Sequence, residues 1–110
     1  KDIEVVTGIS GSGPAYVYAF IEALTNAGIK LGLKSDIALT LATQTTLGAS
    51  KLVFSTGENP EKLKNMVATP GGTTIEGINA LEKGGLKELI LEAVTKATEK
   101  SRHLQNSLDE

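Results

Sequence analysis

The chain has 110 residues, of which 40% are hydrophobic and 22% charged, an ordinary composition for one globular domain. It contains no cysteine, which excludes a disulfide framework, thiol catalysis and a cysteine-ligated zinc site. The net charge is -2 and the basic residues are scattered, which argues against a nucleic-acid partner. No apolar run approaches the ~20 residues that span a bilayer, and no signal peptide is recognisable. We therefore expect a cytoplasmic protein without a membrane partner.

The first third of the chain predicts an extended segment, a loop and a helix. Residues 3–7 are rich in β-branched side chains, which favours a short strand or an extended lead-in. Glycine and serine dominate Gly8–Pro14, which predicts a loop with Pro14 in the first turn of the next helix. Apolar residues at spacings of one, three and four predict that helix over about residues 14–32, ending at Gly32.

A second helix is predicted from Ser35 to Gly57, and apolar or small residues surround most of it. These residues are Ile37, Ala38, Leu39, Leu41, Ala42, Thr45, Gly48, Ala49, Leu52, Val53 and Phe54. A helix that is apolar nearly all round is normally buried. A chain of this length can hardly bury such a helix by itself, so we expect a second copy of the chain to intertwine with it.

The remaining sequence predicts three more helices and no strand. A third helix opens at Pro60, a fourth runs from about Thr74 to Lys83, and a fifth runs from Leu86 to near Leu104. The polar tail from Gln105 is expected to fray. The predicted fold class is therefore all-α, a single domain over residues 1–110 with about five helices, intertwined in a homodimer.

The first glycine cluster resembles the start of a dinucleotide-binding unit, because Gly11 and Gly13 follow β-branched residues and precede a helix. That fingerprint requires a small residue at position 16, where Tyr16 stands, and a second strand after the helix, where another helix is predicted. A tight turn that lets two backbones approach is the favoured interpretation, and it leaves the loop free to line a ligand pocket. A small anion- or nucleotide-binding domain that uses Gly11 and Gly13 remains an alternative.

The second glycine cluster, Pro70–Thr74, directly precedes a predicted helix start. The free amides and dipole of a helix start attract anions, which suits a small carboxylate or phosphate. Thr73 and Thr74 add hydroxyl groups at the same place. The sequence is equally compatible with a plain capped turn, in which Thr73 is the N-cap and Glu76 completes a capping box.

Few other residues predict chemistry. His103, the only histidine, lies near the C-terminus and is expected to be exposed. Glu58, Glu76 and Glu82 could act as acids, although most glutamates on helices are solvated. No His, Asp or Glu cluster has the spacing of metal ligands, so no metal site is predicted.

Both glycine motifs resemble segments of one enzyme family. Thr7–Tyr16, which reads TGISGSGPAY, is similar to the TGLSGSGPAY segment of pyrroline-5-carboxylate reductases. Thr69–Ile75 (TPGGTTI) and Leu81–Gly85 (LEKGG) are similar to the signature of that family near its C-terminus. Shorter similarities occur at Glu22–Leu24, Gln44–Thr45 and Leu63–Lys64. The resemblance extends over essentially the whole chain.

The resemblance implies an oxidoreductase that reduces 1-pyrroline-5-carboxylate to L-proline with NADPH or NADH, the last step of proline biosynthesis. Its helical domain, similar in fold to the C-terminal domain of 6-phosphogluconate dehydrogenase, forms a homodimer, and in many members the dimers assemble further, often into decamers. The family has a Rossmann domain in front of the helical one. That domain is absent from residues 1–110, so the fragment is expected to bind no cofactor and to be inactive alone.

The resemblance also places a small-molecule substrate on this chain. It implies that the substrate carboxylate binds at Thr69, Gly71, Gly72, Thr73 and Thr74. The Thr74 hydroxyl would face the imine nitrogen as the catalytic group. Because a threonine hydroxyl is a poor general acid, we expect Thr74 to orient the imine by a hydrogen bond, while water or an already protonated iminium supplies the proton. Many members have serine where this chain has Thr69, which keeps the hydroxyl. A purely structural helical dimerisation module remains the second alternative.

Overall fold

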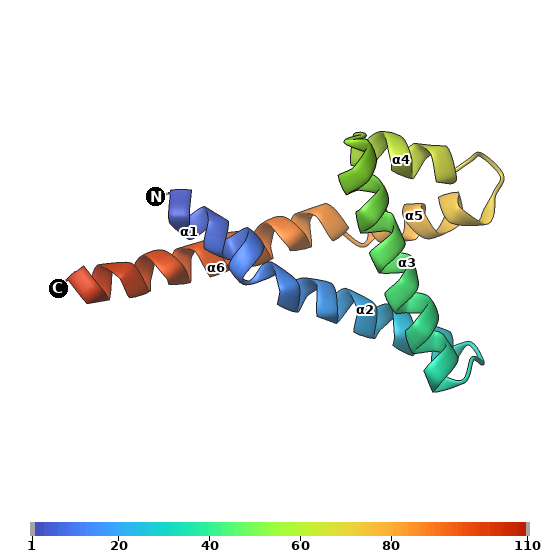
Figure 1. Ribbon diagram of the computed structural model, residues 1–110, viewed down its shortest axis with the longest axis horizontal. Helices are drawn as coiled ribbons and strands as arrows, with labels where there is room; N and C mark the ends of the chain where they lie inside the picture. Colours follow the sequence, from blue (N-terminus) through green and yellow to red (C-terminus); the bar gives the residue numbers. More distant parts are fainter. Residues whose placement is uncertain (1, 110) are drawn as a thin grey trace. The chain divides into compact units, whose positions relative to one another are not determined.

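The computed structural model describes residues 2–109, and that part of the chain is helical without any strand (Figure 1). Its elements are α1 (Asp2–Val6), the π-helix η1 (Thr7–Gly11), α2 (Gly13–Lys30), α3 (Ser35–Thr56), α4 (Pro60–Val67), α5 (Thr73–Lys83) and α6 (Leu86–Asp109). The all-α prediction is confirmed, and the five predicted helices correspond to α2 to α6. None of the helices described is both long and apolar enough to cross a membrane.

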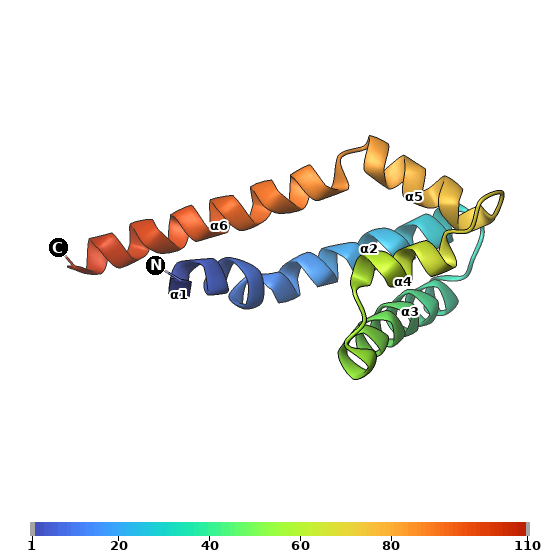
Figure 2. The same cartoon turned by 90° about the horizontal axis from the view of Figure 1, so that it is seen from above.

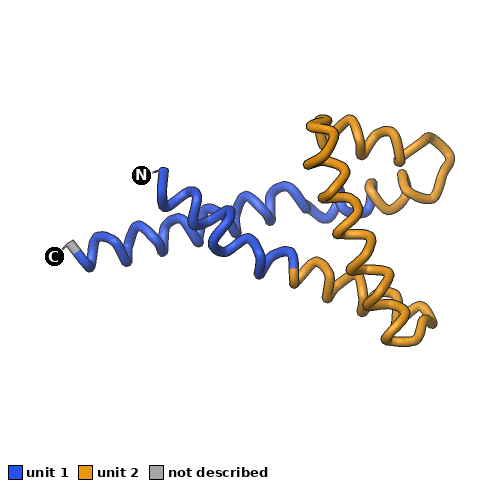
Figure 3. Tube along the Cα trace, in the orientation of Figure 1, with its two compact units in different colours: residues 1–17, 79–110 blue, residues 18–78 orange. Residues whose placement is uncertain are grey.

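The chain divides into two units (Figure 3). Unit 1 comprises Lys1–Val17 and Asn79–Glu110, and unit 2 comprises Tyr18–Ile78. In unit 1, α1 and η1 pack against α6, so segments from opposite ends of the sequence lie side by side (Figure 2).

The expectation of a strand followed by a loop at the start of the chain is wrong, because these residues form α1 and η1. The Thr7 hydroxyl donates a hydrogen bond to the Ile3 carbonyl at 3.0 Å, and the Ser10 hydroxyl donates to the Val6 carbonyl at 3.0 Å. The Ser12 amide donates to the Thr7 carbonyl at 2.8 Å, the five-residue spacing of a π-turn. Threonine and serine often favour turns, but here the hydroxyl groups of Thr7 and Ser10 form hydrogen bonds with carbonyls of the same helical segment.

Close contact with α6 explains the first glycine motif. Gly8 is buried, and a Cβ atom added to it would lie 2.5 Å from Thr98 Oγ1 and 2.9 Å from the Val94 carbonyl oxygen. The Tyr16 hydroxyl donates to the Ala93 carbonyl at 3.3 Å. The same stretch of α6 thus contacts both ends of the motif, and Gly8 permits a close approach of two backbones. The tight turn expected at Gly11 and Gly13 is not formed, because Gly11 ends η1 and Gly13 begins α2.

Helix α6 is longer than predicted, because it continues past Leu104 to Asp109. No glycine or proline follows Gly85, and most residues of this stretch favour helix. Arg102 Nε lies 3.8 Å from Glu4 Oε1, which adds an ion pair between α6 and α1.

In unit 2, α2 and α3 meet at the turn that joins them. Gly32, with φ of +114°, follows α2 as predicted, and Gly57 ends α3 in the left-handed conformation with its amide bonded to the Val53 carbonyl. Ala38 and Ala42 of α3 are each only 3% exposed. A Cβ atom on Gly28 would lie 3.3 Å from the Ala38 Cβ, so small residues allow this close approach.

Much of the large apolar surface of α3 is not buried by its own chain. Phe54 is 91% exposed, Leu47 65% and Leu39 51%. Among the residues described, the buried apolar side chains are all alanines, namely Ala38, Ala42 and Ala68. The sequence predicts that this apolar surface of α3 is buried. Its burial therefore requires contact with a surface outside this chain.

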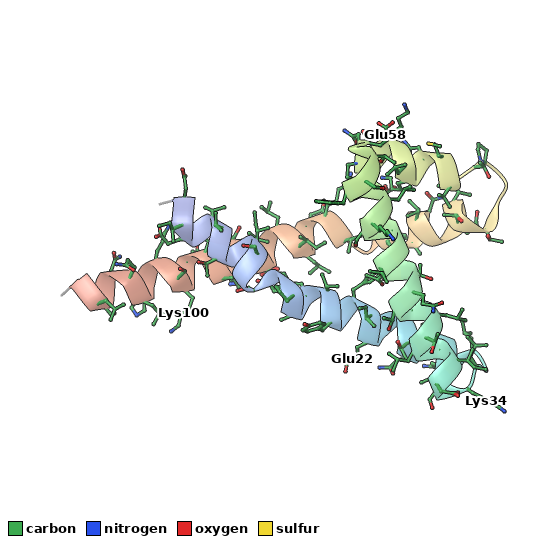
Figure 4. All side chains as sticks on the ribbon, in the orientation of Figure 1. Glu22, Lys34, Glu58 and Lys100 are labelled. Atoms are coloured by element: carbon green, nitrogen blue, oxygen red, sulfur yellow. The ribbon has the colours of Figure 1, made fainter. Side chains whose placement is uncertain are left out.

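Several charged side chains are directed into solvent. Figure 4 shows Glu22, Lys34 and Lys100 pointing away from the ribbon. Glu58, which precedes α4, forms an ion pair with Lys62 of that helix at 3.3 Å. Such exposed pairs contribute little to stability, so packing of apolar surface has to provide most of it.

Candidate functional site

The segment between α4 and α5 begins with a tight turn centred on Ala68. The Ala68 amide donates to the Lys64 carbonyl at 2.9 Å, which is the last hydrogen bond of α4. Ala68 then has φ of -86° and ψ of 69°, and the Thr69 amide donates to the Val67 carbonyl at 3.0 Å. This is the geometry of an inverse γ-turn, which turns the chain sharply away from the axis of α4.

A second turn, Thr69–Gly72, follows at once. The Gly72 amide donates to the Thr69 carbonyl at 3.1 Å, and Gly71 has φ of +80°. With Pro70 at its second position and a positive φ at its third, this is a type II β-turn. Gly71 occupies the position that requires glycine, because other side chains are strained at that φ.

Helix α5 begins directly after this turn, with Thr73 as its first residue. Within residues 2–109, the amides of Thr73, Thr74 and Ile75 have no hydrogen-bond acceptor, as is normal for a first helical turn. These three amides and the positive end of the helix dipole attract an anion. The structure thus has three unbonded amides at the helix start where the sequence predicts an anion site.

The capped-turn interpretation of the same residues is wrong in detail. Thr73 lies inside α5 rather than at the N-cap, so the helix begins one residue earlier than predicted. In the part of the chain that the structure describes, no hydrogen bond joins Thr73 to Glu76. The amide of Gly72 is also already bonded within the turn. Ile75, which sequence reasoning missed, provides an amide instead, and the rule that the first helical turn has free amides could have found it.

The Thr74 hydroxyl is half-buried and has no hydrogen-bond partner within residues 2–109. A threonine inside a helix can donate to the carbonyl four residues earlier. Three others in this chain do so, namely Thr7, Thr46 and Thr56. For Thr74 that residue is Pro70, which lies in the turn before the helix. The hydroxyl therefore remains able to donate to a ligand.

All the predicted substrate-binding residues lie in this one segment of unit 2. They are Thr69, Gly71, Gly72, Thr73 and Thr74. Of the other candidates, His103 is exposed on α6, as predicted, and Glu58 is engaged with Lys62. Among the residues described, no group of three or more His, Cys, Asp or Glu side chains could hold a metal ion.

The Gly11–Gly13 motif does not fit a dinucleotide. The fingerprint requires a strand before the glycines, whereas the structure has η1 at that place. Tyr16 stands where a small residue is needed, and its hydroxyl is bonded to α6. These observations argue against the nucleotide-binding alternative within this chain.

Comparison with known sequences identifies the family. Residues 1–104 match the family described as pyrroline-5-carboxylate reductase dimerisation. The chain belongs to this family, and the match covers nearly every residue.

Relatives with curated descriptions carry the same name. The chain is 51% identical over 104 residues to the pyrroline-5-carboxylate reductase of Glycine max, covering 94% of this chain and 38% of that protein. It is 47% identical over 105 residues to that of Escherichia coli, covering 96% and 39%. The chain thus spans about two fifths of the length of these relatives.

A solved structure shares the fold. The crystal structure of Plasmodium falciparum pyrroline carboxylate reductase with NADP bound superimposes with a TM-score of 0.90 at 42% sequence identity. The match covers 94% of this chain and 42% of that one. Sequence and fold therefore agree on the family.

Proposed function

We propose that this chain is the helical dimerisation and substrate-binding part of an NAD(P)H-dependent, cytoplasmic pyrroline-5-carboxylate reductase, which reduces 1-pyrroline-5-carboxylate to L-proline. The observation that carries the substrate role is the start of α5, where three amides and one hydroxyl without partners in residues 2–109 lie within one helical turn. A cyclic imino acid with one carboxylate and one ring nitrogen matches that set of donors. The relatives that share this segment carry the name of the same enzyme.

In this proposal the amides of Thr73, Thr74 and Ile75 hold the substrate carboxylate. The turn from Thr69 to Gly72 lets the ligand approach at Gly71, which has no side chain and where no described atom beyond its two chain neighbours lies within 4 Å of the position of a Cβ atom. The Thr74 hydroxyl forms a hydrogen bond with the imine nitrogen and orients the ring, and water or an already protonated iminium supplies the proton. The nicotinamide cofactor supplies a hydride when bound, and its binding residues lie outside these 110 residues, in a Rossmann domain.

The same proposal includes a homodimer. Helices α3 and α4 border an apolar groove of about 500 Å³, whose lining includes Gly48, Ala49, Leu52, Val53, Leu63 and Met66. Exposed apolar surface of this kind marks an interaction site, and the family is described by dimerisation. Exposed leucines also occur on α6, at Leu91, Leu104 and Leu108, and could support assembly of dimers into a decamer.

The direct test is an assay of the full-length protein with 1-pyrroline-5-carboxylate and NADPH or NADH, with proline measured by chromatography. Proline formation supports the proposal, and its absence with both cofactors contradicts it.

Calorimetric titration of the isolated 110-residue chain separates the alternatives. We expect no NADPH binding, whereas micromolar affinity would favour a nucleotide-binding domain. Proline binding would exclude a purely structural module.

A further inference from the structure

Among the residues described, Ala68 is the only buried apolar residue next to the candidate site. It is 8% exposed, and the other buried apolar residues described, Ala38 and Ala42, both lie on α3. Ala68 occupies the junction at which the chain leaves α4 and enters the first of the two turns. Ala68 is therefore buried at the point where the direction of the segment is set, and its side chain has no polar atom that could bind a ligand.

The segment after Ala68 has little freedom of its own. The amides of Ala68, Thr69 and Gly72 are all bonded to carbonyls within the segment or α4. Pro70 has a fixed φ, which restricts the second turn further. Displacement of the backbone at Ala68 would therefore carry the two turns with it and move the first turn of α5.

We infer that Ala68 is a positioning residue for substrate binding, which sets where the amides of α5 meet the substrate carboxylate. This inference rests on the proposed function. The amides contact the carboxylate equally in the bound substrate and in the transition state. Misplacing them should therefore raise KM for the substrate and leave kcat nearly unchanged.

The test uses the full-length enzyme with Ala68→Val, which adds two methyl groups at the enclosed position. We expect KM for 1-pyrroline-5-carboxylate to rise about tenfold, the effect of moderate overpacking. The KM for the cofactor, kcat and the oligomeric state should stay at parent values. Ala68→Gly removes the methyl group instead and should raise the substrate KM by a factor of about three through a looser junction. If Ala68→Val does not fold, the substrate KM of Ala68→Gly decides the test.

The matched control is Ala23→Val, which adds the same two methyl groups at an exposed position of α2. It should keep the parent KM values. An unchanged substrate KM in both Ala68 variants would overturn the inference, as would an equal change in substrate and cofactor KM. If the parent enzyme itself does not reduce 1-pyrroline-5-carboxylate, the proposed function fails, which is a separate result.

Discussion

The hydroxyl oxygen of Thr69 lies 3.1 Å from the position that a Cβ atom on Gly72 would occupy. The Thr69 carbonyl oxygen lies 3.3 Å from the same point and accepts the hydrogen bond from the Gly72 amide. The turn before α5 is thus closed by a hydrogen bond and also filled by a side chain. Any residue larger than glycine at position 72 has to push Thr69 aside.

Gly72→Ala should therefore disturb the substrate site while leaving the helices intact. We expect KM for 1-pyrroline-5-carboxylate to rise by a factor of about three to ten, because small displacements of binding groups are costly. This KM is measured by steady-state kinetics of the full-length enzyme. Thr69→Ser is the control, because it keeps the hydroxyl and should stay near the parent value. A Gly72→Ala enzyme with parent KM would show that the turn adapts without cost.

Thr74→Ala removes the hydroxyl that we assign to the imine nitrogen. In the full-length enzyme kcat/KM should fall by about 10- to 1,000-fold, the loss of one transition-state hydrogen bond worth roughly 1.5–4 kcal/mol. Thr74→Ser should recover most of the activity. The melting temperature and oligomeric state should hardly change, because this hydroxyl has no partner within residues 2–109.

Thr73→Ala is the matched control for Thr74→Ala. Thr73 is exposed, lies inside α5 and makes no side-chain hydrogen bond in the described part of the chain. Its replacement should alter stability by no more than about 0.5 kcal/mol, as for an ordinary surface position. Equal losses of kcat/KM in the two variants would contradict a specific role for the Thr74 hydroxyl.

Gly8→Ala should destabilise unit 1. The added methyl group would overlap Thr98 Oγ1 and the Val94 carbonyl oxygen, and the carbonyl cannot move without disturbing α6. We expect a loss of about 1–3 kcal/mol, measured by thermal unfolding of the full-length protein. Gly13→Ala is the control, because a Cβ atom there meets no atom within 4 Å. Similar melting temperatures for the two variants would argue against close packing of Gly8.

Gly48→Leu tests the proposed dimer through α3. A Cβ atom on Gly48 meets no atom of its own chain within 4 Å outside its helix, so the fold of the protomer has room for a larger residue. A loss of assembly would therefore report on a second copy of the chain. Sedimentation at low micromolar concentration should detect monomer for Gly48→Leu, because overpacking at the interface weakens the dimer by about 1–3 kcal/mol. The same measurement should detect dimer for Gly48→Ala. A fully dimeric Gly48→Leu would place the interface elsewhere.

Helices α2 to α6 could be predicted from the sequence because the residues that start and end them are local signals. Gly57 ends α3 and Pro60 opens α4 where the helix rules place them. The segment before α2 was not predictable in the same way. Its β-branched residues favour a strand, yet contact with α6, some 90 residues later, and hydroxyl groups bonded back to carbonyls keep it helical. Such long-range contacts override local propensity.

At the candidate site, the sequence predicted the right loop but only part of its geometry. The glycines and threonines of Pro70–Thr74 indicated an anion site at a helix start. Sequence rules did not reveal that the Gly72 amide is bonded to Thr69, because that depends on the turn type. The burial of Ala68 depends on packing around α4, and the sequence contains no signal for it.

A crystal structure of the full-length protein with L-proline tests the assignment of the substrate site most directly. Proline keeps the carboxylate and the ring nitrogen of the proposed substrate. We predict that its carboxylate oxygens lie within hydrogen-bond distance of the amides of Thr73, Thr74 and Ile75, with the ring nitrogen beside the Thr74 hydroxyl. A carboxylate bound away from the start of α5 would contradict the site assignment, even if the enzyme forms proline.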